Sequence, residues 1–235
     1  MKNNNRTIVL DTETTGINNI NPPHLNHRII EIGAVEIINR RFTGNNFHEY
    51  IKPNRLIEEN AIKVHGITND FLSDKPCFKE ISKKFFYYIK NSDVVIHNAS
   101  FDVGFINQEF SMLNKNFQNI SKICCIIDTL KMARELFPGK KNTLDALCTR
   151  YKIKHSHRIL HGALLDAFLL AKLYLLMTSG QESILFQNNI QNITNNQHQK
   201  QSIIKKDRSL KILKANKIEL QLHENYLRHI KKNLF

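Results

Sequence analysis

The chain has 235 residues and a formal net charge of +13, and 41% of its residues are hydrophobic while 23% are charged. This length and composition predict one globular domain with a tail, and they exclude a small fold that depends on disulfides or a structural metal. The four cysteines form no C-x-x-C pair and no apolar run is long enough to span a bilayer, so we expect a cytoplasmic protein with no membrane partner. The basic charge alone does not identify a nucleic-acid-binding protein, because Lys, Asn and Ile are abundant along the whole chain.

Runs of β-branched residues with short connections predict three strands, at residues 6–13, 28–39 and 46–52. We expect these strands to form an antiparallel meander. The pattern then changes to alternating helices and strands. Helices are predicted at 78–90, 101–113, 143–151 and 162–177, and short strands at 93–97 and 124–128. The resulting fold class is α/β, with a mixed five-stranded sheet flanked by helices.

The composition changes near residue 180. Ten of the fifteen residues from 187 to 201 are Asn or Gln, which predicts a disordered linker. Beyond it, apolar residues return at four-residue steps among Lys and Arg. They are Ile218, Leu222, Tyr226 and Ile230. This spacing predicts a basic amphipathic helix that docks on a partner, with a nucleic-acid-binding tail or plain disorder as the alternatives.

Two carboxylates, Asp11 and Glu13, lie at the end of the first predicted strand. Residues two apart in a strand point to the same face, with Cα atoms roughly 7 Å apart. Carboxylates so close repel each other unless a cation lies between them, and a hard divalent ion such as Mg²⁺ prefers their oxygens. The alternative is a solvated strand end before a turn at residues 14–16. For an isolated D-x-E pattern, this alternative is the better explanation.

Two further acids follow in comparable settings. Asp102 lies where a buried strand runs into a helix, at the edge of the sheet where ligand sites gather. Its alternative role is to complement the helix dipole beside Ser100 as N-cap. Asp166 is the only carboxylate of an apolar helix and needs a partner if it is buried. His161 is expected in the loop just before that helix, over the site, although a polar flank is the alternative.

The order of these residues resembles the DEDD exonucleases, in their histidine-bearing branch with the RNase H-like fold. The matching residues are Asp11, Glu13, Asp102, His161 and Asp166. Longer stretches, among them IVLDTETTG, VIHNASFDVGFIN and LHGALLDA, are similar to the proofreading subunit family of the bacterial replicative DNA polymerase. The similarity covers nearly all of residues 6–178. It implies a 3′→5′ exonuclease domain over residues 1–180 that acts on single-stranded or frayed 3′ ends of DNA.

The resemblance also implies roles for single residues. Asp11, Glu13 and Asp166 are expected to hold two Mg²⁺ or Mn²⁺ ions, with Asp11 as the bridge, while Asp102 acts mainly through metal-bound water. His161 is expected to take the proton from the attacking water, because histidine is largely a free base at neutral pH.

Contacts with the substrate are expected from the same acids and from two residues of the VHGIT region. These are Asp11, Glu13, Asp166, Asn60 and His65. Relatives often carry a glutamate at the position of Asn60, which the family places near the terminal nucleotide.

The family resemblance extends to partners. Gln181, Ile184 and Phe186 resemble the short motif by which replication proteins dock on the sliding clamp, with a fraying helix end as the alternative. This motif and the linker occupy residues 181–201. The tail, residues 202–235, is expected to bind the catalytic alpha subunit of the polymerase. The resemblance also suggests a small theta subunit as a further partner.

Two other functions stay open at this point. An RNA-trimming nuclease of the same superfamily shares all five catalytic residues, but it needs neither the clamp-like motif nor the long linker. A catalytically weak scaffold of the polymerase core is the second alternative. The presence of all five residues argues against it, whereas the departure at Asn60 leaves room for reduced activity.

Overall fold

Residues 6–20, 22–113, 119–154, 160–179 and 216–232 are described in a computed structural model of the chain. The chain divides into two units, Met1–Ser183 and Ile184–Phe235, and each is described by itself. In the described part, no helix has the length and apolar character needed to cross a membrane.

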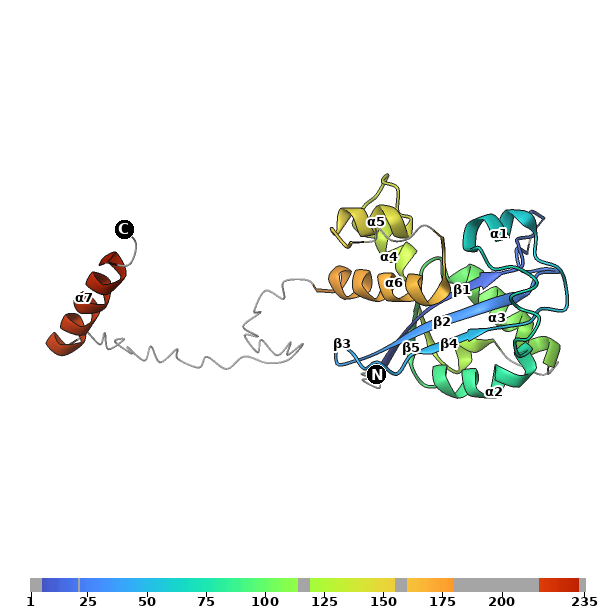
Figure 1. Ribbon diagram of the computed structural model, residues 1–235, viewed down its shortest axis with the longest axis horizontal. Coiled ribbons are helices and arrows are strands. Elements are labelled where there is room, and N and C mark those ends of the chain that lie inside the picture. The colour runs from blue at the N-terminus through green and yellow to red at the C-terminus, as the bar shows by residue number, and fades with distance from the viewer. Residues whose placement is uncertain (1–5, 21, 114–118, 155–159, 180–215, 233–235) are drawn as a thin grey trace, which may run out of the picture. The chain divides into compact units, whose positions relative to one another are not determined.

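A mixed sheet lies at the centre of the first unit (Figure 1). β1 (Arg6–Thr14) pairs antiparallel with β2 (Ile29–Ile38) and parallel with β5 (Asp93–Ile96). β6 (Cys125–Asp128) extends the parallel side, and β4 (Phe47–Tyr50) pairs antiparallel with β2. These five strands confirm the predicted sheet, including its antiparallel meander. The two-residue β3 (Arg41–Phe42) is an addition that pairs with the end of β2.

Helices cover both faces of this sheet (Figure 1). α2 (Phe78–Ile89) and α3 (Ala99–Leu113) pack on one face, and α4 (Thr129–Leu136), α5 (Leu144–Arg150) and α6 (Ala163–Met177) pack on the other. The four predicted helices are confirmed to within two residues at each end. The short helices α1 (Glu59–His65) and α4 are additions to the predicted elements, as is a single 3-10 turn at Ile120–Lys122.

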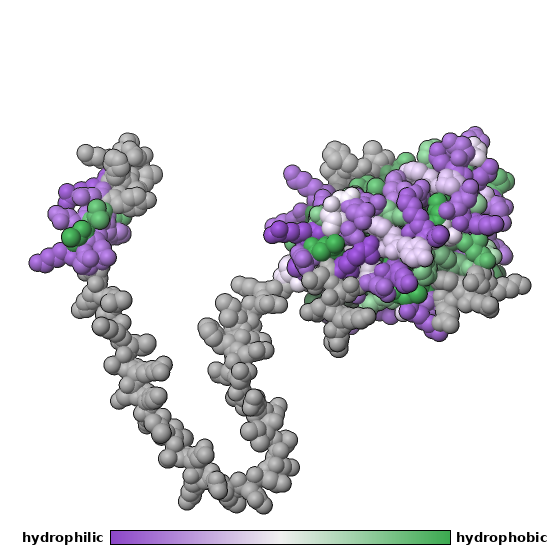
Figure 2. Space-filling view, turned by 90° about the horizontal axis from the view of Figure 1, so that it is seen from below, coloured by the Kyte–Doolittle hydropathy of each residue, from purple (hydrophilic) through white to green (hydrophobic). Residues whose placement is uncertain are grey.

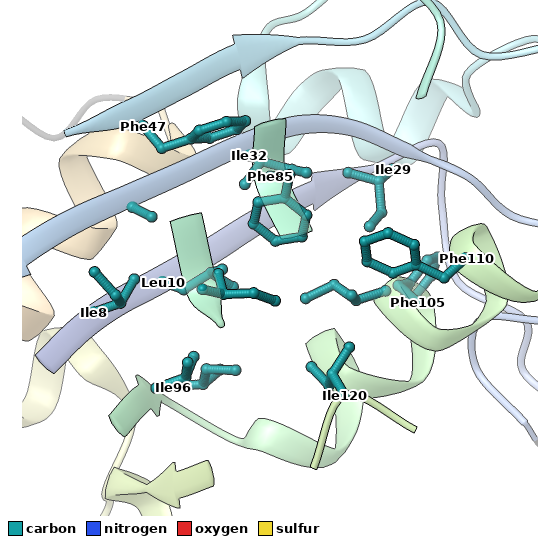
Figure 3. Packing of buried hydrophobic residues seen from close by; sticks show 14 of the residues in the cluster. Ile8, Leu10, Ile29, Ile32, Phe47, Phe85, Ile96, Phe105, Phe110 and Ile120 are labelled. Atoms are coloured by element: carbon teal, nitrogen blue, oxygen red, sulfur yellow. The ribbon is translucent and has the colours of Figure 1, made fainter. Parts of the chain in front are cut away.

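The side chains of β1 alternate between two hydrophobic cores. Ile8 and Leu10 pack in the core under α2 and α3, where Figure 3 shows Phe85 and Phe110. Val9 instead belongs to the core under α6. Because alternate residues of a strand share a face, Asp11 and Glu13 continue the Val9 series and point toward α6. The alternation that fills the cores therefore also aims both acids.

The second unit contains α7 (Lys217–Lys232), as the four-residue spacing predicts. Asn216 and Glu219 start it with a capping box, in which each side chain accepts a hydrogen bond from the other's backbone N–H at 2.8 and 2.9 Å. Ile218 and Leu222 are 70% and 64% exposed, and Figure 2 shows apolar and hydrophilic side chains together on this helix. The clamp-like motif and residues 187–215 lie outside the described residues.

Candidate active site

The end of β1 changes its register beside the predicted acids. Asp11 lies opposite Gly33 and Glu13 opposite Glu31, but the pairing shifts between Glu13 and Thr14. Such an irregularity redirects the chain and is common beside active sites. The strand then turns sharply, with the Thr14 hydroxyl donating a hydrogen bond to the Gly16 carbonyl at 3.0 Å.

Two residues of β2 place the first turn of α6 over these acids. A Cβ atom built on Gly33 would lie 2.1 Å from the backbone nitrogen of Leu164, so only glycine permits this approach. The buried Glu31 accepts a hydrogen bond from the backbone N–H of Ala163 at 3.1 Å, and its other oxygen lies 2.7 Å from Nε2 of His48. Neither Glu31 nor Gly33 was among the predicted site residues, although two acids and a glycine interrupt the apolar residues of this strand.

Asp166 and His161 meet at the start of α6. Asp166 lies in the first turn and is 2% exposed. His161 precedes Gly162, the N-cap, so it lies in the loop as expected. Its Nδ1 atom is 3.3 Å from Oδ2 of Asp166, and its side chain is 43% exposed. The backbone N–H of His161 donates a hydrogen bond to the carbonyl of Val64 in α1 at 3.0 Å, which fixes the loop from the other side.

Glu13, His161 and Asp166 form a cluster in which one ligand atom from each lies within 4.8 Å of the others. Two carboxylates and an imidazole at this spacing fit a divalent cation, and the carboxylate oxygens suit Mg²⁺ or Mn²⁺. Asp11 and Asp102 are not members of this cluster. Asp11 shares the strand face of Glu13, whereas Asp102 approaches the strand from its other face.

Asp102 is tied to β1 through the residue between the two strand acids. It lies in the first turn of α3, is 3% exposed, and accepts a hydrogen bond from the Thr12 hydroxyl at 2.7 Å. Burial raises the pKa of Asp102 to about 7, and the hydrogen bond from Thr12 opposes this rise. The charged form of Asp102 is thus disfavoured until a cation compensates for it.

A cavity of about 330 Å³, which we call the α1 cavity, opens beside Glu13. The end of β1, the following loop and α1 line it, and Phe101 of α3 completes the wall. Both expected substrate contacts, Asn60 and His65, are among the lining residues. His65 is 6% exposed, and burial lowers the pKa of its ring, with a smaller lowering from His161.

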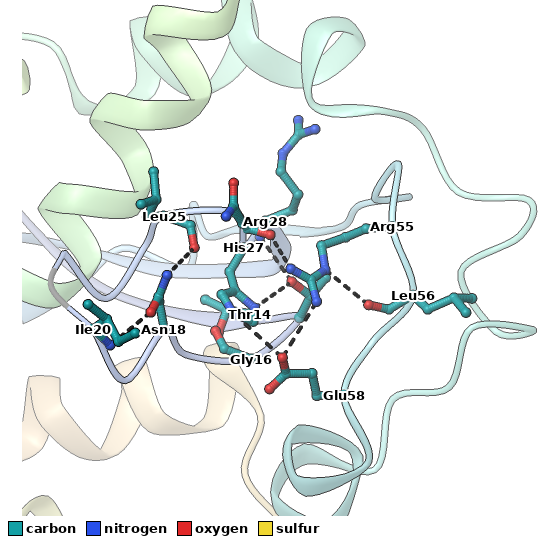
Figure 4. Close-up of polar contacts among 12 residues, drawn as sticks. Thr14, Gly16, Asn18, Ile20, Leu25, His27, Arg28, Arg55, Leu56 and Glu58 are labelled. Atoms are coloured by element: carbon teal, nitrogen blue, oxygen red, sulfur yellow. Dashed lines mark hydrogen bonds and ion pairs between the residues drawn. The ribbon is translucent and has the colours of Figure 1, made fainter.

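Glu58 lines the α1 cavity, and Figure 4 shows it beside Gly16 and the Arg55 side chain. Its Oε1 lies 3.6 Å from Nε2 of His27 and 3.5 Å from the Arg55 guanidinium. Arg55 also donates a hydrogen bond to the Asn26 carbonyl. A Cβ atom on Gly16 would lie 2.5 Å from the Glu58 carboxylate. Glu58 was not predicted as a site residue, because nothing in its local sequence separates it from a solvated acid.

The fold and the acidic cluster together define a metal-dependent nuclease of the exonuclease class, and the exonuclease family model RNase_T matches residues 8–174. A DNA polymerase III subunit epsilon from Buchnera aphidicola subsp. Schizaphis graminum is 73% identical over 232 residues, which cover 99% of this chain and 100% of that protein. The epsilon subunit from Escherichia coli (strain K12) is 49% identical over 230 residues, covering 97% and 94%. The chain belongs to the DNA polymerase III subunit epsilon family.

Solved structures agree on the fold. Exonuclease X, in complex with 5′ overhanging duplex DNA, is similar with a TM-score of 0.53 and 27% identity over 73% of this chain and 90% of that one. The nuclease domain of 3′hExo, a DEDDh family member bound to rAMP, has a TM-score of 0.61 and 18% identity, over 75% and 92%. At that identity the likeness to 3′hExo shows the fold alone.

Proposed function

We propose that this chain is the proofreading 3′→5′ exonuclease of a bacterial replicative DNA polymerase, and that it removes mispaired 3′-terminal nucleotides as nucleoside monophosphates. The observation that carries the proposal is the meeting of Glu13, His161 and Asp166 beside the α1 cavity. It occurs in a chain that is 73% identical to an epsilon subunit over 99% of its length.

The carboxylates of Asp11, Glu13 and Asp166 would hold two Mg²⁺ or Mn²⁺ ions. When bound, these ions offset the charge of the phosphodiester, lower the pKa of the attacking water and stabilise the leaving 3′ oxygen. Asp102, which the hydrogen bond from Thr12 holds in place, would contribute through ordered water.

His161 takes the proton from the attacking water. Its Nδ1 lies 3.3 Å from Oδ2 of Asp166, and we assign the proton from water to Nε2, the other ring nitrogen. The 43% exposure of the side chain gives water access to it. Asn60 and His65 contact the terminal nucleotide in the α1 cavity. A mispaired end reaches this cavity more readily than a paired one, because it has already lost pairing and stacking energy.

The rest of the chain connects the exonuclease domain, residues 1–180, to its partners. Gln181, Ile184 and Phe186 dock on the sliding clamp, and the linker up to residue 201 follows. The tail, residues 202–235, binds the alpha subunit. The exposed apolar residues of α7 support this role, because apolar side chains gathered on a helix surface favour contact with a partner. The theta subunit, where it is present, completes the core.

Digestion of a 3′-mispaired primer–template and of a matching RNA tests the function, with Mg²⁺ or Mn²⁺ and an Asp11→Ala control. We expect the wild-type protein to shorten the DNA from its 3′ end and the control to be inert. Absence of DNA trimming, even with the purified polymerase subunit present, would contradict the proposal. A shortened RNA would then indicate an exoribonuclease, and an intact RNA would indicate a scaffold.

A further inference from the structure

A second cavity, of about 550 Å³, opens where β5 and β6 end. We call it the α4 cavity, because α4 and the loop of residues 137–143 form much of its wall. Arg134 and Lys140 line it with exposed side chains, and in the described part of the chain neither side chain has a hydrogen-bonding or ion-pair partner. Among the described residues that line the cavity there is no acid. Asp128, at the end of β6, caps α4 and accepts hydrogen bonds from the backbone N–H groups of Leu130 and Asn98 at 2.9 and 3.2 Å.

The loop that carries Lys140 is held in one shape by its neighbours. The Arg150 guanidinium lies 4.3 Å from the centre of the Phe137 ring and donates hydrogen bonds to the Asn142 side chain and the Lys141 carbonyl, at 3.1 and 2.9 Å. The buried Asn142 also donates to the Phe137 carbonyl. Because these contacts fix the backbone of the loop, they keep the exposed Lys140 residue at the wall of the cavity.

The α4 cavity lies next to the acidic site. Val9 and Val95 pair across the neighbouring strands β1 and β5. Asp11 lies two residues further along β1, and His97 directly follows the end of β5 at Ile96. His97 lines the α4 cavity, so the cavity begins one strand away from Asp11. Asn98 follows in a left-handed conformation, with φ of 64°, and also lines it. Phe101, three residues later, lines the α1 cavity. The start of α3 therefore separates the two cavities.

We propose that the α4 cavity is a subsite for backbone phosphates of the DNA strand upstream of the bond that is cut. Arg and Lys side chains neutralise phosphates, and most protein contacts to nucleic acid that set the register are of this kind. Asn98 adds an amide, while Leu130 and Leu144 provide apolar surface for a sugar or base. This inference rests on the proposed exonuclease function and adds a residue-level account of how the strand is held.

The test compares two substrates of the full-length protein. One is a single-stranded oligodeoxynucleotide of about ten residues. The other is the 4-nitrophenyl ester of thymidine 5′-monophosphate, which has a phosphodiester but no upstream nucleotide. For the double variant Arg134→Ala, Lys140→Ala, we expect the ratio of kcat/KM on DNA to kcat/KM on the ester to fall about tenfold. The slope of log KM for DNA against the logarithm of the salt concentration should fall by about 1.4. Each of the two lost phosphate contacts removes about 0.7 from this slope on a single strand.

Lys141→Ala is the control for the Lys140 substitution, because it removes one positive charge from the neighbouring position, which does not line the cavity. Its ratio should stay within about twofold of the wild-type value. An unchanged ratio in the double variant would overturn the inference, and so would an equal fall in Lys141→Ala, which would indicate a general charge effect. If the wild-type protein hydrolysed neither substrate, this result would instead overturn the proposed function. Thermal melting of each variant confirms folding.

Discussion

Asp102 and Asp166 are both almost fully buried, but they reach β1 from opposite faces of the sheet and are held by different means. On the α3 face, a side-chain hydrogen bond from Thr12 holds Asp102 against β1. On the α6 face, the backbone of the helix packs on Gly33, and this contact sets where Asp166 and His161 lie. One half of the site therefore depends on a polar contact and the other on the absence of a side chain. Their responses to substitution should differ accordingly.

The largest expected effect on the α6 side is the loss of the proposed general base. His161→Ala should lower kcat by about 10²–10⁴-fold, the usual contribution of a positioned base, with a much smaller change in the Kd for DNA. Single-turnover kinetics and binding measured in Ca²⁺ separate the two quantities. Unchanged turnover would contradict the role of His161.

Gly33→Val should disturb the whole α6 side at once. The added side chain would collide with the first turn of α6, so we expect destabilisation of about 1–3 kcal/mol and at least a tenfold loss of activity as Asp166 moves. Denaturant unfolding and exonuclease assays measure both. Gly162→Ala is the control at the same junction, because a Cβ atom there meets nothing within 4 Å. Equal effects of the two substitutions would argue against the packing contact.

Thr12→Val should affect the α3 side alone. It keeps the size of the side chain but removes the hydrogen bond that favours the charged form of Asp102. The pKa of Asp102 should rise further, so activity at neutral pH should fall about tenfold and recover at a pH roughly one unit higher. The pH–rate profile is the measurement. A uniform loss at all pH values would show that the hydrogen bond acts by another route.

Asp102→Asn should give the smallest effect, on stability in the absence of metal. With its pKa raised to about 7, folded Asp102 keeps a proton that the unfolded chain releases near pH 4. Its contribution to stability is therefore complete below about pH 4 and is lost as the pH rises through about 7. The asparagine variant lacks this loss, so its Tm relative to wild type should increase between about pH 5 and pH 8. Calorimetry with a chelator checks this, and parallel Tm curves would contradict it.

The same contrast explains what could be predicted from the sequence. Strands β1 and β2 and helix α6 follow from long apolar patterns, and the five acidic and histidine positions follow from their order along the chain. Helices α1 and α4 have only seven and eight residues, so local patterns do not separate them from loops. The Thr12–Asp102 hydrogen bond joins residues 90 apart in sequence, and the contact of Gly33 with α6 spans more than 120. Such contacts depend on the packed sheet and have no local signal.

The hydrogen bond from His161 to the Val64 carbonyl has a consequence for selectivity. α1 contributes Asn60 and His65 to the wall of the α1 cavity, and its C-terminal Gly66 lies against Leu160, beside His161, the proposed general base. A nucleotide that filled the cavity would press on the same helix that anchors this proposed base. Part of its binding energy can then be used to align His161 instead of tightening the complex, so a poorly seated end would be cut slowly even when it is bound.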